Sequence, residues 1–467
     1  MFDVTLLLFD GVFVEKILRI QPNVKKLFLL LRAADTKSAT QRLNNEVHVK
    51  ITASTYSTAD HRKGAVQSSE REIRCKSKFL ISEKVTPVAG GISCEDLGVK
   101  DSTLREEMWR EVDIVLNLAA TTNLDERYEV PLAINALGPK HVLSFAKKCA
   151  KLKTFLHINN GLFSAYVSGE RAGVILENSF NMGESLNGTS GLDIDAEIKL
   201  ADQKLNELRA EGATEAEITS AMKDLGIKTI YGWKNTYVFT KSMGEMLVGQ
   251  LKENVPLVIL RPSIITSTYK EPFPGWVEGI RTIDSLAVGY GKGKLTCFAG
   301  DPNSIIDLIP ADMVVNAIIV AMVTNANQPS EIIYHVGSSV RNPESFSSIQ
   351  DIGQRYFTEK PWINKDGTPV KVGKGLQVVN SAFCQYFQGT YIEMNRKIKF
   401  VMRLVDLYKS YLFFKGVFDD MNTEKLQMAA RESCAESDLF YFDPKCIVWE
   451  DYSLNIHLPG IVKYVFK

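Results

Sequence analysis

Three residues of types that can reduce a carbonyl group stand in a suggestive order in this chain: Ser164, Tyr237 and Lys241. Tyr237 and Lys241 lie four residues apart in NTYVFTKSMGE, a helical pattern, so the phenol and the ammonium share one helix face. A nearby ammonium lowers the pKa of a phenol, which lets a tyrosine donate a proton near neutral pH. A serine hydroxyl can stabilise charge that develops on a carbonyl oxygen, and a lysine can hold the ribose of a nicotinamide cofactor.

The four-residue spacing alone is weak support, because an exposed lysine one turn after a half-buried tyrosine is common. The chain has four other pairs with this spacing: Tyr290 and Lys294, Tyr356 and Lys360, Tyr411 and Lys415, and Tyr441 and Lys445. Order and context distinguish the Tyr237 pair. It follows an apolar run and a serine turn, and a further apolar run that ends in Arg261 and Pro262 comes after it.

The elements that must position these residues read as alternating strands and helices. Short apolar runs at 4–10 and 26–32 flank a helical pattern at 12–20, which is the size of one β-α-β unit. Further strands are predicted at 85–88, 113–118, 155–158, 257–260 and 332–336, and further helices at 139–150 and 240–251. This alternation predicts an α/β fold with a doubly wound parallel sheet.

Two stretches depart from the alternation of strands and helices, and the amino-acid composition changes after about residue 343. Residues 48–77 have no clear period and read as a loop, whereas about 196–225 is charged and helical, with a break at Gly212 and Thr214. After about residue 343 aromatic residues and basic helical patterns become more frequent. We therefore expect a cofactor-binding domain over 1–343, with a helical insertion, and a smaller, mainly helical domain over 344–467.

Composition excludes several functions. Lys+Arg and Asp+Glu balance at 55 each, so the chain has no electrostatic reason to bind nucleic acid. Seven scattered cysteines without C-x-x-C spacing indicate free thiols in a reducing, intracellular compartment, and the six histidines form no metal-binding motif. The apolar N-terminal stretch carries Asp3 and Asp10 and lacks a basic region, so it is a poor signal peptide, and it is too short to span a membrane.

Several motifs give the chain a family resemblance. The run DIVLNLAATTNLDERYEVPLAINALGPKHVL at 113–143 resembles the fourth strand and following helix of extended short-chain dehydrogenases. The turn SAYVSG that begins at Ser164 is similar to the catalytic turn of that superfamily, and Tyr237 and Lys241 match its Tyr-x-x-x-Lys. The stretches YGWKNTYVFTKSMGEMLV, LRPSIITSTYKEPFPGWVEG, FFKGVFDDMNTEKL and FYFDPKCIVWEDY narrow the resemblance to plant alcohol-forming fatty acyl-CoA reductases.

The resemblance implies a Rossmann domain, NADPH as cofactor, and four-electron reduction of a long-chain or very-long-chain fatty acyl-CoA to a primary alcohol and CoA. It gives the catalytic roles to Ser164, Tyr237 and Lys241. The cofactor contacts that it implies are Arg32, Asn117, Ala119, Ala120, Tyr237, Lys241, Pro262 and Ile264. Arg32 ends the second predicted strand, where an arginine suits the 2′-phosphate of NADP.

The sequence and the family resemblance also suggest expectations about membrane contact and cellular location. The basic and aromatic stretch 396–415 could lie on a membrane surface, although a half-buried helix pair is the simpler interpretation. The family resemblance implies association with the endoplasmic reticulum, in wax, suberin or pollen-wall lipid metabolism.

The chain departs from the family at its N-terminus. The family begins with T-G-x-x-G-F, whose glycines let the backbone approach a pyrophosphate, but Val4 and Leu7 stand at the aligned positions and Gly11 is out of register. The family's acidic residue after the third strand is replaced by Gly91.

Three hypotheses follow. The first is an active reductase, and the intact Ser164, Tyr237 and Lys241 favour it. The second is a catalytically impaired splice form or non-catalytic relative, which the altered glycine motif favours. The third is a sugar-nucleotide epimerase, against which the FFKGVFDD region argues.

Overall fold

The computed structural model describes most of the chain. The described residues are 4–7, 11–21, 23–48, 82–159, 167, 172–188, 191–228, 231–233, 235–277, 279, 282–295, 297–373, 377–379, 411, 413–433 and 437–466. The predicted loop at 48–77 and the stretch 396–415 therefore lie almost wholly outside the described residues.

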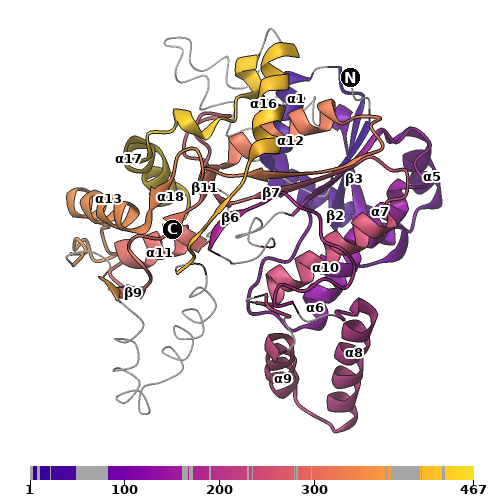
Figure 1. The fold of residues 1–467 in the computed structure, drawn as a ribbon, viewed down its shortest axis with the longest axis horizontal. Coiled ribbons are helices and arrows are strands. Elements are labelled where there is room, and N and C mark those ends of the chain that lie inside the picture. The colour runs from indigo at the N-terminus through magenta and orange to yellow at the C-terminus, as the bar shows by residue number, and fades with distance from the viewer. Residues whose placement is uncertain are drawn as a thin grey trace.

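A seven-stranded sheet forms the centre of the molecule (Figure 1). Its strands are β1 Val4–Leu7, β2 Lys26–Arg32, β3 Val85–Gly90, β4 Ile114–Asn117, β5 Thr154–Ile158, β7 Leu257–Pro262 and β12 Glu331–Val336, in the order β12-β7-β5-β4-β1-β2-β3. Every pair of neighbours is parallel. The predicted doubly wound parallel sheet is therefore confirmed. The chain order reverses between β1 and β4, and ligands bind such sheets in the crevice outside the carboxyl ends of the strands at that point.

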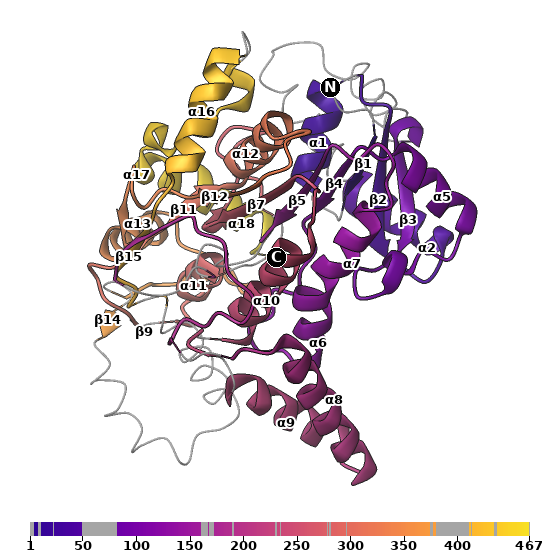
Figure 2. The same cartoon turned by 45° about the vertical axis from the view of Figure 1, so that its right-hand side comes forward.

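Helices cover both faces of the sheet, as Figures 1 and 2 show. On one face lie α1 Gly11–Ile20 and α12 Ala311–Thr324, which contact each other. On the other lie α5 Ser102–Glu111 and α7 Leu137–Ala146. Strand β2 shows the division. Leu27, Leu29 and Leu31 belong to the first core, whereas Phe28 and Leu30 belong to the second, because successive side chains of a strand point to opposite faces.

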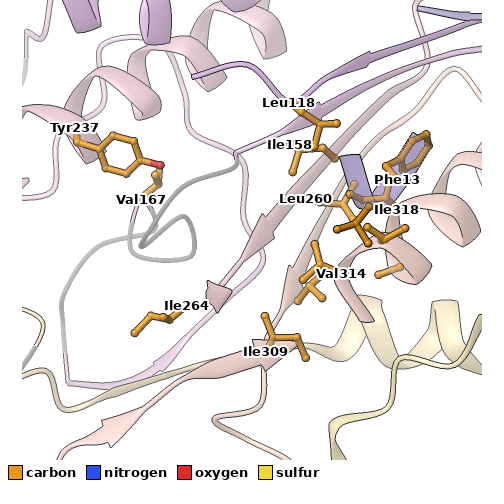
Figure 3. Packing of buried hydrophobic residues seen from close by; sticks show 14 of the residues in the cluster. Phe13, Leu118, Ile158, Val167, Tyr237, Leu260, Ile264, Ile309, Val314 and Ile318 are labelled. Atoms are coloured by element: carbon orange, nitrogen blue, oxygen red, sulfur yellow. The ribbon is translucent and has the colours of Figure 1, made fainter. Parts of the chain in front are cut away.

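The first core includes residues far apart in the sequence. Figure 3 shows Phe13 of α1 and Ile318 of α12 together near Leu260 of β7. All three side chains are almost fully buried. This packing holds the helices of that face against the sheet.

A helical hairpin projects from the body of the molecule at the bottom of Figures 1 and 2. It consists of α8 Ile194–Ala210 and α9 Glu215–Lys228. The Asp193 side chain accepts a hydrogen bond from the Ala196 amide at the start of α8, and Gly212 takes a positive φ of 73° in the connection. The stretch that the sequence predicted to be helical, with a break at Gly212, is thus two helices.

Short strand pairs outside the central sheet bring distant parts of the chain together. Strand β15 Gly416–Phe418 pairs with β6 Gly173–Ile175, and β11 Leu308–Pro310 pairs with β8 Ile264–Thr266. The other short strand pairs are β9 Cys297–Ala299 with β14 Gln377–Val379, and β10 Ile305–Ile306 with β13 Glu344–Ser345. The remaining α-helices are α2 Thr36–Arg42, α6 Glu129–Pro131, α10 Thr236–Leu251, α11 Thr282–Gly291, α13 Phe346–Glu359, α16 Met421–Ser433, α17 Trp449–Tyr452 and α18 Leu458–Tyr464. Within the described part of the chain, no helix has both the length and the apolar character needed to cross a membrane.

Candidate active site

Helix α10 carries Tyr237 and Lys241 in its first turns. Asn235 caps the helix, and its side chain accepts a hydrogen bond of 3.0 Å from the Val238 amide. The Asn235 amide also donates to the Tyr411 hydroxyl. Tyr237 is 1% exposed and Lys241 fully buried, and Figure 3 shows the Tyr237 ring directed toward Val167. The cap therefore fixes where the helix begins and, with it, the position of both side chains.

The Lys241 amine has unused hydrogen-bonding capacity. Its Nζ is buried and has no hydrogen-bond partner among the described residues. Burial lowers the pKa of Lys241 to about 7, and the carboxylate of Glu245 acts in the opposite direction. A buried donor without a partner is costly, so this amine suits a ligand that brings hydroxyl groups, such as the ribose of a nicotinamide cofactor.

A polar pair that the sequence did not reveal lies at the carboxyl ends of β4 and β5. His157 Nδ1 is 3.2 Å from Asn117 Nδ2, and both side chains are fully buried. Because the amide donates, Nδ1 accepts, and the imidazole carries its proton on Nε2, for which the described residues offer no partner. Burial, followed by the charges of Lys241 and Arg261, holds the pKa of His157 well below its ordinary value. His157 is therefore a neutral group beside the amine.

Two asparagines shape the turn that follows β4. The Asn117 side-chain oxygen accepts from the Ala119 amide at 3.2 Å. Asn135 accepts from the Thr121 amide at 3.0 Å and donates to the Thr121 carbonyl oxygen at 3.1 Å. Ala119 and Ala120 are half-buried in this turn. The two asparagines thus hold the turn at Ala119 and at Thr121, on either side of Ala120.

Close packing keeps α10 against this turn. A Cβ on Gly244 would lie 2.2 Å from the Asn135 carbonyl oxygen, so only glycine lets the two segments approach this closely. The Asn135 amide also donates to Thr240 Oγ1 at 3.3 Å. The helix that carries Tyr237 and Lys241 is therefore in direct contact with the Asn135 segment.

The remaining predicted cofactor contacts lie on other strands of the same edge. Pro262 ends β7 and Ile264 begins β8, and both are buried. Arg32 ends β2 with an exposed side chain, and the Arg42 guanidinium donates to its carbonyl oxygen at 2.9 Å. The structure thus brings Arg32, Asn117, Pro262 and the Tyr237 helix to the carboxyl edge of one sheet. Ser164 lies outside the described residues.

The N-terminus forms the strand that the sequence predicted within residues 4–10, followed by a helix that begins at Gly11. Val4–Leu7, which align with the glycine motif of the family, form strand β1 and pair with β2 and β4. Gly11 is the first residue of α1 and not part of the turn. Three residues, Leu8, Phe9 and Asp10, connect strand and helix, and they lie outside the described residues. The sheet thus takes an inner strand, between β4 and β2, from the residues that align with the loop.

Among the described residues, no group of three or more His, Cys, Asp or Glu side chains is arranged to hold a metal ion. The seven-stranded parallel sheet and the buried tyrosine and lysine at its carboxyl edge define a Rossmann-type reductase.

Comparisons with known proteins identify the family. Residues 10–318 match a family model described as male sterility protein, NAD-binding, and residues 374–467 match a second, described as male sterility protein, sterile. The chain is 54% identical over 483 aligned positions to the alcohol-forming fatty acyl-CoA reductase of Simmondsia chinensis, covering 98% of this chain and 94% of the relative. It is 47% identical to fatty acyl-CoA reductase 1 of Arabidopsis thaliana, covering 98% and 95%. The chain belongs to the fatty acyl-CoA reductase family.

Solved structures support the fold. The terminal R domain of the myxalamid biosynthetic pathway superposes with a TM-score of 0.59 at 16% identity, covering 100% of this chain and 92% of that domain. The reductase domain of a nonribosomal peptide synthetase from Mycobacterium tuberculosis gives a TM-score of 0.52 at 16% identity, covering 100% and 91%. At these identities the likeness concerns the fold alone.

Proposed function

We propose that this protein reduces long-chain or very-long-chain fatty acyl-CoA to a primary fatty alcohol, releases CoA, and uses NADPH as reductant in wax, suberin or pollen-wall lipid metabolism. The observation that carries the proposal is the buried pair of Tyr237 and Lys241 on α10, at the carboxyl edge of the sheet. The similarity to the Simmondsia relative, an alcohol-forming fatty acyl-CoA reductase, supports the proposed substrate and product.

Each proposed role follows from the chemistry of the side chain. When bound, each cofactor molecule would supply one hydride, so the two successive reductions would consume two cofactor molecules. Tyr237 donates a proton to the carbonyl oxygen, and the Lys241 ammonium stabilises the charge that remains on the phenol. Ser164 donates a hydrogen bond to the same oxygen. In the first reduction the carbon–sulfur bond breaks and CoA leaves as the thiol. In the second, the aldehyde becomes the alcohol.

We propose NADPH, and not NADH, as the cofactor because two arginines lie near the end of β2. The Arg32 side chain is exposed at the strand terminus, and the Arg42 side chain reaches the Arg32 backbone. Two guanidinium groups in this region suit a 2′-phosphate, because guanidinium binds phosphate through paired hydrogen bonds. Asn117, Ala119, Ala120, Pro262 and Ile264 are proposed to line the rest of the cofactor site, with Lys241 on a ribose.

Two further features are proposed on the family resemblance. The first is association with the endoplasmic reticulum, and the second is peripheral contact with a membrane surface through residues 396–415. The alternative of a catalytically impaired form is not favoured, since 54% identity to an alcohol-forming reductase extends over 98% of this chain.

Product analysis tests the proposed function. Purified full-length protein is incubated with labelled octadecanoyl-CoA and excess NADPH or NADH, and the lipid products are separated by chromatography. We expect labelled octadecanol with NADPH and much less with NADH. An aldehyde as the dominant end product, or no lipid product at all, would contradict the proposal.

A further inference from the structure

An apolar pocket lies away from the Tyr237 helix, between three helical segments. Its walls are α11, α13 and the chain around His457 at the start of α18, which lie near one another in Figures 1 and 2. Ala287, Ile349, Gly353 and Leu458 are among the lining residues, and the pocket is partly open to solvent. Among the described residues that line the pocket, none has a side chain with a fixed charge.

The polar atoms of the largest lining side chains are engaged elsewhere. The Tyr452 hydroxyl donates to the Ser267 carbonyl oxygen at 2.7 Å, and the Tyr290 hydroxyl donates to the Gly373 carbonyl oxygen at 3.0 Å. His457 lies 3.0 Å from the Ser267 hydroxyl through Nδ1 and 3.3 Å from the Asp284 carboxylate through Nε2. These three rings therefore offer mainly carbon surface to a ligand.

The pocket is connected to the proposed active site through two paired strands. Leu308 lines the pocket and stands opposite Ile264 in the pairing of β11 with β8. Ile264 follows two residues after Pro262, the last residue of β7. The pairing of β8 with β11 thus places the pocket wall next to the strand that follows the carboxyl end of β7.

We propose that this pocket binds the hydrocarbon chain of the acyl substrate and sets the chain length that the enzyme prefers. The inference rests on the proposed function, because it takes the occupant from the acyl-CoA substrate. A largely apolar hollow binds an alkyl chain by removing methylene groups from water. Small residues at Ala287 and Gly353 leave room for that chain.

Gly353 offers a direct test because a side chain can be added there at little structural cost. A Cβ built on Gly353 meets no atom within 4 Å, and the residue lies inside α13, where leucine is a better helix former than glycine. Gly353→Leu should therefore fill the pocket without weakening the helix. Ala287→Leu narrows the opposite wall, and Thr358→Leu, at an exposed position of α13, is the matched control.

The first readout is kcat/KM of the full-length protein for octadecanoyl-CoA and decanoyl-CoA. In Gly353→Leu and Ala287→Leu we expect the value for the longer substrate to fall at least about tenfold, while the value for the shorter stays within about twofold. Thr358→Leu should leave both unchanged. Equal losses for both substrates, or no loss for either, would overturn the pocket assignment.

The second readout does not depend on reduction. Binding of cis-parinaric acid, a fluorescent fatty acid, is titrated in the wild type and the three variants. We expect affinity at least about tenfold lower in both pocket variants and unchanged in the control. The same affinity in all four proteins would overturn the assignment. If the protein formed no alcohol but the pocket variants still bound the fatty acid more weakly, the proposed function would be contradicted. The assignment of the pocket to an alkyl chain would remain supported.

Discussion

Glu245 and Arg261 form a buried, bidentate ion pair that joins helix α10 to strand β7. Arg261 Nη2 lies 2.6 Å from Glu245 Oε2, its Nε lies 3.1 Å from both carboxylate oxygens, and neither side chain is more than 2% exposed. Lys241 precedes Glu245 by one helical turn, and Pro262 follows Arg261. The pair therefore fixes the position of Lys241 along the α10 axis relative to the end of β7.

Glu245→Gln should destabilise the protein strongly, because it leaves the Arg261 guanidinium buried without its counter-charge. We expect a loss of about 3–5 kcal/mol in the free energy of unfolding, measured by urea denaturation. The control is Glu450→Gln, which removes the exposed pair with Arg355 and should cost no more than about 1 kcal/mol. Similar losses in the two variants would show that α10 does not depend on the buried pair.

Tyr237→Phe should abolish most reduction while the fold is kept, because the phenol ring remains and only the proton donor is lost. We expect kcat for octadecanoyl-CoA to fall on the order of 100-fold or more. Tyr441→Phe provides the control, since Tyr441 belongs to another Tyr-x-x-x-Lys pair and is not among the residues that line the apolar pocket. A Tyr237→Phe variant with nearly parental activity would remove the phenol from the mechanism.

Lys241 should make the ligand-free protein less stable at low pH. The folded state lowers the pKa of Lys241 from 10.5 to about 7, so between these values the unfolded chain holds one more proton than the folded one. The free energy of unfolding therefore rises with pH across this window. Lys241→Met removes the buried amine and should stabilise the protein more at pH 6 than at pH 9.

Thermal unfolding at the two pH values measures this effect. We expect the gain from Lys241→Met to be larger at pH 6 by at least about 1 kcal/mol. Lys199→Met on the exposed side of α8 should change stability by the same small amount at both pH values. A gain from Lys241→Met that does not vary with pH would mean that the amine keeps its ordinary proton affinity.

The N-terminal turn should bind NADPH weakly. A pyrophosphate needs backbone N–H groups that it can approach closely, and glycines provide the room, but the connection between β1 and α1 is Leu8, Phe9 and Asp10. The Asp10 carboxylate would also repel the phosphates. Replacing residues 8–10 by a glycine-containing loop of the family should lower the dissociation constant at least about tenfold, as measured by NADPH fluorescence.

Asp10→Asn separates the two causes, because it removes the charge and keeps the short turn. We expect it to recover only part of the affinity. Equal dissociation constants for the original and the glycine-loop protein would show that this turn does not limit cofactor binding.

The sequence by itself determined the sheet and the Tyr237 helix. The apolar runs predicted five later strands that the structure has as β3, β4, β5, β7 and β12, because strands buried on both faces must be apolar throughout. The spacing of Tyr237 and Lys241 placed both on one helix face, because a helix repeats every 3.6 residues. The roles given to these residues and to Ser164 stay predictions.

Only the tertiary structure decided how distant residues meet. From the sequence alone Arg261 is only the end of a strand, yet its charge is balanced by Glu245 of helix α10. His157 contacts Asn117, which lies 40 residues away in the sequence, and His457 contacts Ser267, which lies 190 residues away. The apolar pocket likewise combines helices whose own periods predict ordinary core packing. Such contacts depend on how separate elements dock, and sequence periodicity reports only the face that each element buries.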